Sequence, residues 1–323
     1  MRTRTSVTAT SASLRLCAII ACAAACGDPA PEVVRNDRRF EEVVIDTVWS
    51  RGSVDDTVIE LPLHVRADGD LLLISDVARR GIAALRTADG STAWTLGRAG
   101  RGPGEFRRPS AIEVLPDGRV LVADTEVGRV TILDRAGAYQ TEFPLEDAQV
   151  TGLCALEDGT LVAVAATDGE NVSRLSLTGQ VLGRHSVPWP ELVEAPMLAR
   201  QLVAATGPDR KECYVALSLG RGFTAFDGSR FLFTKDFVER VDAPVVEVRE
   251  SGSRRNPVTD SQVRNGTIST RSVAATPDGF FVVFEGSTED AARIVDVYTR
   301  AGEYDYSFRL PAVAHKFTWS DGT

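Results

Sequence analysis

Short runs of Val, Leu, Ile and Phe recur along the chain after about residue 45, and Gly, Asp or Pro breaks them every eight to twelve residues. Runs of this length between turn-forming residues are typical of strands in an all-β protein. Helical periodicity is weak and confined to residues 191–204, where Pro196 interrupts it. The pattern therefore predicts an all-β fold.

A unit of roughly 40 residues repeats along the chain. Its clearest copy, residues 110–145, predicts strands at 111–115, 120–124, 129–134 and 139–143 with turns between them. The copies align on the turn between the first two strands, which is marked by Asp68-Gly69, Asp117-Gly118, Asp158-Gly159, Pro208-Asp209, Asp278-Gly279 and Asp321-Gly322. Successive markers are 41 to 69 residues apart, as one four-stranded sheet per marker requires.

A repeated four-stranded unit cannot bury both of its faces alone, so such units pack radially around an axis. Six markers predict a six-bladed β-propeller of four-stranded antiparallel blades over residues 46–323. A β-sandwich or barrel would not need this regular recurrence. The sixth marker stands where a first strand ends, so we expect the last blade to be incomplete at the C-terminus: the sequence is a fragment, or the ring is open or five-bladed with an added strand. Residues 43–50 could supply the outer strand of that blade.

The N-terminus predicts export. Residues 1–15 carry three arginines and no acid, and residues 16–25 form an apolar run too short to span a bilayer. This segment resembles a bacterial lipoprotein signal, residues 1–25, that is cut before an acylated Cys26, with Cys22 as the alternative site and plain secretion as a further reading. Residues 26–45 are then a polar tether. We expect an exported protein, anchored by lipid to a bacterial membrane and facing the periplasm or the cell exterior.

The net charge and the positions of the cysteines narrow the possible partners and the covalent structure of the protein. The formal charge of −9 becomes −12 once three arginines leave with residues 1–25. A nucleic acid is therefore not expected as a partner, because phosphate neutralisation needs a basic face. Cys154 and Cys213 both lie in apolar strand patterns. Export would permit a disulfide between them, but buried free thiols are the favoured interpretation.

Residues 97–139 resemble an NHL repeat. The matching positions are Gly97, Gly100, Gly102, Gly104, Phe106, Pro109, Asp117, Gly118, Val122, Ala123, Asp124, Thr125, Arg129, Val130, Asp134 and Gly137. Ser110 and Gly128 depart from the pattern, where the family often has Gly and Asn. With its lipoprotein signal, the whole chain resembles the bacterial six-bladed propeller lipoproteins, many of which have no assigned activity.

Most of these residues have a structural interpretation. Phe106 is expected to wedge between neighbouring blades, and Asp124 to accept backbone N–H groups of a turn while pairing with Arg129. Similar acid–arginine pairs are expected for Asp76 with Arg79 or Arg80, Asp168 with Arg174 and Asp290 with Arg293. We expect them to lock turns and to have no catalytic role.

Candidate ligand residues lie on the first strands, which line the channel of a propeller. They are His64, Arg66, Glu113, Arg271, His315 and Lys316. His64 and His315 would be neighbours in a closed ring and could hold a metal, as in propeller amidating lyases. Gluconolactonase-like propellers bind a divalent cation through Glu, Asn and Asp, but no Asn stands on a first strand here. No catalytic residue and no cofactor is expected, with a divalent metal as the alternative.

A second candidate region is a surface for a partner. Its members are Arg98, Arg101, Arg107, Arg108, Trp189, Arg254 and Arg255. The first four form a basic loop before the second blade, and the last two lie in a charged insertion over about residues 236–270, of the length usual for functional or disordered loops.

The sequence has no G-x-S-x-G, H-E-x-x-H or phosphate-loop motif. The favoured function is therefore a membrane-anchored cell-envelope module that binds or scaffolds a protein, peptide or glycan. The alternative is an enzyme, a metal-dependent lyase or lactonase working at the channel mouth.

Overall fold

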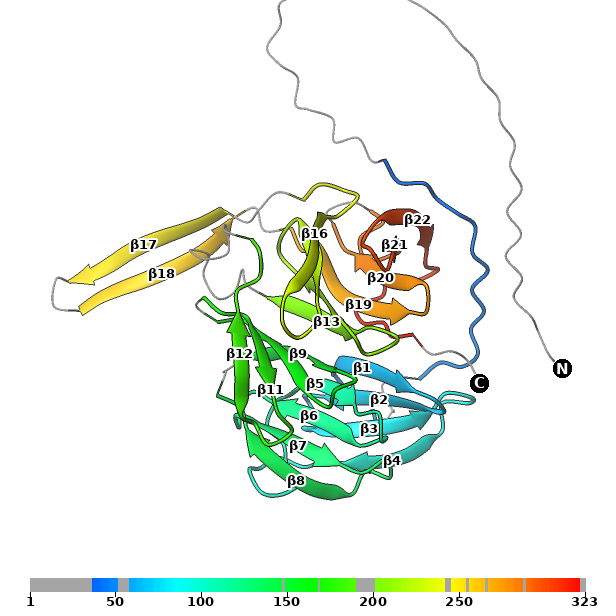
Figure 1. Cartoon of the computed structure of the whole chain (residues 1–323), viewed down its shortest axis with the longest axis vertical. Helices are drawn as coiled ribbons and strands as arrows, with labels where there is room; N and C mark the ends of the chain where they lie inside the picture. Colours follow the sequence, from blue (N-terminus) through cyan, green and yellow to red (C-terminus); the bar gives the residue numbers. More distant parts are fainter. Residues whose placement is uncertain are drawn as a thin grey trace, which may run out of the picture. The chain divides into compact units, whose positions relative to one another are not determined.

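The computed structural model describes residues 37–51, 58–146, 149–167, 169–189, 201–241, 245–253, 256–264, 267–286 and 289–319. These residues belong to a unit that spans Arg35–Thr323. Their regular structure is all β (Figure 1), as the sequence predicts. In these ranges no helix is long and apolar enough to cross a bilayer.

Five four-stranded sheets, here called blades, follow one another along the chain. Each is an antiparallel meander whose strand order in space is its order in sequence. Blade 1 holds β1 (Pro62–Asp68), β2 (Leu71–Asp76), β3 (Gly81–Arg86) and β4 (Thr92–Leu96). Blade 2 holds β5 (Pro109–Val114), β6 (Val120–Asp124), β7 (Arg129–Leu133) and β8 (Tyr139–Pro144).

The remaining blades repeat this plan. Blade 3 holds β9 (Val150–Ala155), β10 (Leu161–Ala165), β11 (Val172–Leu175) and β12 (Val181–His185). Blade 4 holds β13 (Leu202–Thr206), β14 (Cys213–Leu217), β15 (Gly222–Phe226) and β16 (Phe231–Asp236). Blade 5 holds β19 (Thr270–Thr276), β20 (Gly279–Phe284), β21 (Ile294–Thr299) and β22 (Tyr304–Arg309). The fold is a β-propeller with its first strands innermost, since β1, β5, β9, β13 and β19 line one cavity.

The blades pack face to face through apolar clusters. Alternate residues of a strand point to opposite faces, so Leu121 of β6 packs towards blade 3 and Val122 towards blade 1. Phe106, fully buried, lies among residues of blades 1 and 2, which confirms its predicted wedge position. The far face of blade 5 packs on the C-terminal segment, through contacts that include Phe317.

The prediction of six blades is wrong: the described residues form five. Five of the six markers lie at the turn between the first two strands of a blade, so this interpretation of the turn is correct. The sixth marker, Asp321-Gly322, lies outside the described residues, and residues 311–319 before it form no regular strand. The Asp321-Gly322 turn signal is therefore not accompanied by the four strands of a blade among the described residues.

Residues 37–51 also differ from the prediction, since residues 43–50 form no strand. Phe40 instead makes a parallel bridge with Ser307 of β22, and Arg38 is buried against the same blade. Further along, Trp49 Nε1 donates to the Thr87 carbonyl of blade 1 at 2.7 Å. This segment therefore contacts both blade 5 and blade 1, the two blades at the ends of the series.

The insertion after blade 4 is ordered as a hairpin. Strands β17 (Val245–Ser253) and β18 (Asn256–Arg264) pair along nine residues each and form a sheet of their own (Figure 1). The expectation of a long loop is wrong here. The weakly helical pattern of residues 191–204 lies mostly outside the described residues, apart from residues 201–204, where β13 begins.

The cysteine interpretation is also corrected. Cys154 of β9 and Cys213 of β14 form a disulfide that joins blade 3 to blade 4, with both residues fully buried. The two cysteines are 59 residues apart in sequence but meet across the interface between consecutive blades.

Turn locking by acids is confirmed, but the arginine partners differ from those expected. Asp124 accepts backbone N–H groups, whereas Arg129 donates to the carbonyls of Arg101, Gly102 and Glu105 and pairs with Glu142 at 2.8 Å. Similarly, Arg174 pairs with Asp158 and Arg309 with Asp290. Asp168 lies outside the described residues. Arg129 thus joins the loop before blade 2 to strand β8, and does not pair with the acid at the start of its own turn.

Candidate functional site

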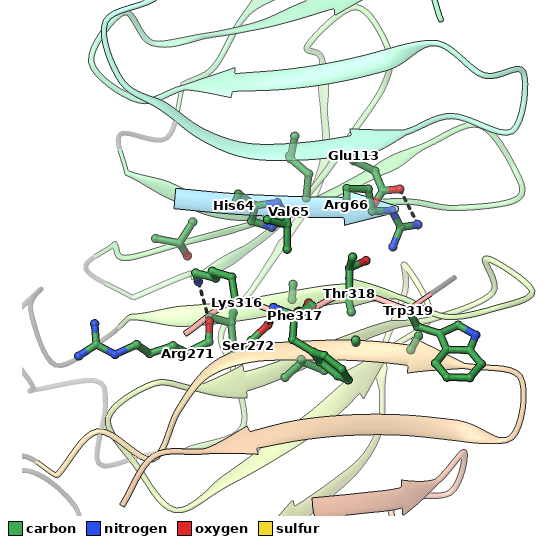
Figure 2. Close-up of a pocket in the computed structure, with 18 residues that line it drawn as sticks. His64, Val65, Arg66, Glu113, Arg271, Ser272, Lys316, Phe317, Thr318 and Trp319 are labelled. Carbon is green, nitrogen blue, oxygen red and sulfur yellow. Dashed lines mark hydrogen bonds and ion pairs between the residues drawn. The ribbon is translucent and has the colours of Figure 1, made fainter. Parts of the chain in front are cut away.

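The innermost strands of all five blades line one cavity. Its walls come from β1, β5, β9, β13 and β19, and from residues 316–319 of the C-terminal segment. Figure 2 shows His64, Val65 and Arg66 on one side of this space and Lys316, Phe317 and Thr318 on the other. The free volume is about 30 Å³, room for roughly two water molecules.

The C-terminal segment takes its place in the wall through hydrogen bonds to strands of two blades. Phe317 N donates to Ser272 Oγ of β19 at 3.0 Å, and Ser272 Oγ donates to Phe317 O at 3.1 Å. On the other side, Ala67 N of β1 donates to Thr318 Oγ1 at 3.1 Å. This segment therefore connects blade 5 to blade 1 and places Lys316 in the channel.

Glu113 is a buried carboxylate of the channel, with 1% of its surface exposed. Its Oε1 lies 3.0 Å from an Arg66 nitrogen and 3.7 Å from an Arg210 nitrogen. Its Oε2 accepts a hydrogen bond from Thr206 Oγ1 at 2.7 Å. Because both oxygens are engaged, Glu113 holds Arg66 and Arg210 in place.

His64 lies on β1, opposite Lys316. Burial, with the positive charges of Lys316 and Arg66, lowers the pKa of His64 to about 3. The imidazole is therefore neutral at physiological pH. Its Nδ1 atom is buried and has no hydrogen-bond partner among the described residues, and the same holds for Nε of Arg66.

Among the described residues, the Lys316 ammonium makes one hydrogen bond. Its Nζ donates to the Arg271 carbonyl at 2.6 Å, as the dashed line in Figure 2 shows. Burial and the positive charge of Arg271 lower the pKa of Lys316 to about 8, against the opposing effect of the Glu285 carboxylate. Lys316 is thus a cation at neutral pH with further N–H groups available.

The structure brings together some of the predicted channel residues and separates others. His64, Arg66, Glu113, Arg271 and Lys316 all line the cavity. His315, by contrast, is exposed and does not line it. Within the described ranges, no three side chains of His, Cys, Asp or Glu gather in a way that could hold a metal ion.

The structure places one residue of the predicted partner surface in the core. Arg98 and Arg107 are tied to Glu105 and Glu126 at 2.7 Å each, and Arg101 and Arg108 are exposed. Trp189 is 1% exposed and packs in the core between blades 3 and 4, so its assignment to a surface is wrong. Its indole ring packs against apolar residues of blades 3 and 4. Arg254 and Arg255 lie outside the described residues.

Sequence reasoning missed several residues of the site, of which four are polar or aromatic side chains with a clear place in it. Thr206 and Arg210 come from β13 and the turn after it, where the repeat is weakest, although Arg210 directly follows the Pro208-Asp209 marker. Thr318 and Trp319 belong to the segment before the sixth marker, which was assigned to a strand of another blade.

Comparison with known proteins supports the fold. A family model described as NHL repeat matches residues 106–133, from Phe106 to the end of β7. The expectation of an NHL-like propeller is confirmed to that extent. A search of curated proteins found no match.

Solved structures resemble the chain over most of its length. A chain of a nidogen/laminin complex aligns with a TM-score of 0.53 at 9% identity, over 80% of this chain and 84% of that one. A protein of Bacteroides fragilis NCTC 9343 that is inferred to be exported aligns with a TM-score of 0.50 at 12% identity, over 80% and 73%. A catalytically inactive virginiamycin B lyase from Staphylococcus aureus with quinupristin gives 0.50 at 12% identity, over 79% and 72%. At these identities the likeness shows the fold alone.

Proposed function

We propose that this protein is an exported, lipid-anchored propeller that acts as a binding module of the cell envelope, for a protein, peptide or glycan. The observation that carries the binding role is the channel itself, a cavity on the innermost strands whose lining includes the charged side chains Arg66, Glu113, Arg271 and Lys316. Glu113, the acid between Arg66 and Arg210, has both oxygens engaged in hydrogen bonds and ion pairs. Glu113 therefore holds the Arg66 guanidinium in position at the cavity, where it could interact with a charged group of a ligand.

The disulfide supports export. Buried disulfides persist in oxidising compartments and are rare in the reducing cytosol. Cys154 and Cys213 form one inside the core, and the signal-like residues 1–25 precede the propeller. These two features are independent, since one depends on the N-terminal sequence and the other on the packing of blades 3 and 4.

Anchoring is tested by labelling the chain with an alkyne fatty acid in a bacterial host. The wild-type protein should carry the label in the membrane fraction, and Cys26→Ala should abolish it. Cys22→Ala is the matched control and should keep the label. A label that survives Cys26→Ala and is lost in Cys22→Ala would move the acylation site, and no label in any form would refute the anchor.

The binding role is tested on an array of envelope peptides and glycans. We expect the full chain to retain at least one class and Lys316→Met to lose it. The unfolding midpoint of this variant should stay near the wild-type value, because Lys316 Nζ donates to a backbone carbonyl, that of Arg271, and its loss leaves no buried carboxylate unpaired. Mass spectrometry of the retained ligand should find it unchanged. Conversion of the ligand would refute a pure binding role and favour the enzymatic alternative.

A further inference from the structure

Residues 42–48 lie between two points where the chain is fixed to the sheets. Phe40, before them, makes a bridge with Ser307 of blade 5, and Trp49, after them, donates to the Thr87 carbonyl of blade 1. Between these points every residue is exposed, and Figure 1 draws the segment in blue without a strand arrow. Because both ends are held, part of the conformational entropy of this segment is lost before any partner binds.

The backbone of this segment has no partner in the part of the chain that the structure describes. No N–H or C=O group of residues 42–48 takes part in a hydrogen bond there. The pairing with blade 5 ends at Glu41, whose N–H donates to the Ser307 carbonyl. A backbone with a row of unpaired N–H and C=O groups is a template for another strand.

The side chains of this segment favour a strand and a covered surface. Five of the seven residues are β-branched, and such side chains prefer the extended conformation. Four of them are exposed large apolar side chains, namely Val43, Val44, Ile45 and Val48, and Val44 is 89% exposed. The remaining exposed large apolar side chains of the described ranges, apart from Phe40 beside them, stand singly in the sequence. Exposed apolar side chains that gather in one place mark a surface for another molecule.

Charge indicates the kind of partner. Residues 41–48 contain Glu41, Glu42 and Asp46 and no basic residue. Glu41 pairs with Arg39 at 3.3 Å, whereas neither Glu42 nor Asp46 has an ion-pair partner within the described ranges. A second copy of the segment would add three more acids to the same sheet, and like charges on neighbouring strands repel. A strand with basic residues is the complementary partner.

We propose that residues 42–48 bind a partner protein by strand addition, and that the partner segment is an extended peptide of β-branched and basic residues. Main-chain hydrogen bonds supply the affinity in this mode of binding, and the side chains supply the specificity. Glu42 and Asp46 lie on the same face of an extended segment, so basic residues four positions apart in the peptide meet both. No residue of this segment lines the channel, so the inference goes beyond the proposed function and does not depend on it.

Fluorescence anisotropy of a labelled peptide with the purified full chain tests the proposal. The probe is Val-Thr-Lys-Val-Val-Thr-Lys with both ends blocked, and its matched control has Glu at the two Lys positions. We expect the basic peptide to bind and the acidic one to bind about tenfold or more weakly, because its charges repel those of the segment. Equal binding of the two peptides would refute the charge selection.

Backbone methylation distinguishes strand pairing from contact through side chains alone. Along an edge strand, alternate residues direct their N–H groups to the neighbouring strand. Two further probes, each methylated on the backbone nitrogens of one alternate set of residues, should therefore differ: one should lose binding and the other should keep it. Equal behaviour of these two probes would refute strand addition.

Variants locate the site. Val44→Pro and Ile45→Pro each remove one backbone donor, and together they cover both alternate sets, so at least one should weaken binding by about tenfold or more. Their unfolding midpoints should stay near the wild-type value, because both side chains are exposed and their backbone groups make no hydrogen bond among the described residues. Val313→Pro is the matched control, since Val313 is also exposed and its N–H makes no hydrogen bond there. The control should bind the peptide as the wild type does.

A change of charge gives the opposite sign. The double variant Glu42→Lys, Asp46→Lys should bind the acidic peptide more tightly than the basic one, which reverses the wild-type preference. An unchanged preference would show that the peptide binds elsewhere on the chain and would overturn the proposal.

Hydrogen exchange on the unmutated chain, read by mass spectrometry, decides between the possible occupants. The amides of residues 42–48 should exchange rapidly in the free chain at every protein concentration and slowly with the basic peptide bound. Slow exchange that depends on protein concentration would assign the segment to a second copy, and slow exchange at every concentration to another part of the same chain. Either result, or no protection by the peptide, would overturn the proposal. The proposed function would be unaffected, because its own test uses Lys316 of the channel.

Discussion

Arg38 and Asp296 are 258 residues apart in sequence and form a two-point ion pair, with Nε to Oδ1 at 2.8 Å and Nη2 to Oδ2 at 2.9 Å. Neither side chain is exposed, and Glu239 contacts the same guanidinium. Ser307 Oγ donates to Asp296 at 2.7 Å, so the carboxylate depends on partners from two separate segments. The first described residues of the chain are thereby fixed to blade 5.

Replacement of Arg38 by Met should lower the free energy of unfolding by about 3–5 kcal/mol, because it leaves the buried carboxylate of Asp296 without its cation. Arg39→Met is the control, since the side chain of Arg39 is 62% exposed and its ion pairs lie at the surface. That change should cost less than about 1 kcal/mol. Urea unfolding measures both, and equal losses in the two variants would show that Arg38 is an ordinary surface contact.

Loss of the disulfide should also destabilise the fold. The bond between Cys154 and Cys213 closes a loop of 59 residues, for which chain entropy gives about 4 kcal/mol. We expect the double variant Cys154→Ala, Cys213→Ala to unfold at lower urea than the oxidised protein. A strong reductant should move the wild-type midpoint in the same direction and leave the variant unchanged. A variant as stable as the oxidised protein would contradict this prediction.

Acid should weaken the fold partly through His64. The pKa of His64 is about 3 in the folded chain, against an ordinary value of 6.5. Between these two pH values the unfolded chain binds a proton at His64 and the folded chain does not. Stability is therefore lost as pH falls from 6.5 towards 3, by up to about 3 kcal/mol at pH 4. His64→Gln should lose less stability than the wild type between pH 7.5 and 4. Parallel losses in the two proteins would show that His64 does not resist protonation.

Asp124 should be sensitive to the loss of its charge. This fully buried carboxylate accepts four backbone N–H groups, from Arg107 at 2.7 Å and from three other residues at 3.1 Å. Asp124→Asn replaces an acceptor by a donor and should cost about 2–4 kcal/mol in thermal or urea unfolding. Asp134→Asn is the matched control, because Asp134 accepts an exposed turn N–H from Ala138, and it should cost less than about 1 kcal/mol. Similar costs at both sites would argue against turn locking by Asp124.

Much of the propeller could be predicted from local sequence. The strands of blade 2 were expected within two residues of their observed ends, because a turn followed by an alternating apolar run is a local signal. The number of blades could not be predicted from local sequence, because a turn marker does not by itself show that four strands surround it. Contacts across the blades were also missed. The pairing of Cys154 with Cys213 and the partners of Arg129 depend on the packing of one blade on the next, which spacing within a repeat does not encode.

The same distinction applies to the candidate site. His64, Arg66 and Glu113 could be predicted because the first strand of each blade faces the channel. Arg210 enters from a turn and Trp319 from an irregular segment, so neither follows the strand rule. The prediction for Trp189 was wrong because its neighbouring prolines suggested an exposed loop. In the structure, the interface of blades 3 and 4 buries this side chain.

The contacts of residues 37–51 determine how the propeller would respond to tension along the chain. A pulling force applied at residue 37 would reach the sheets first at Arg38 and at the backbone hydrogen bonds between Glu41 and Ser307 and between Ser307 and Arg39, each 2.8 Å long. The hydrogen bond of Trp49 to blade 1 lies behind them and would bear load only after they had given way. Tension would thus be resisted in stages, with the contact to blade 5 shielding the contact to blade 1 from tearing.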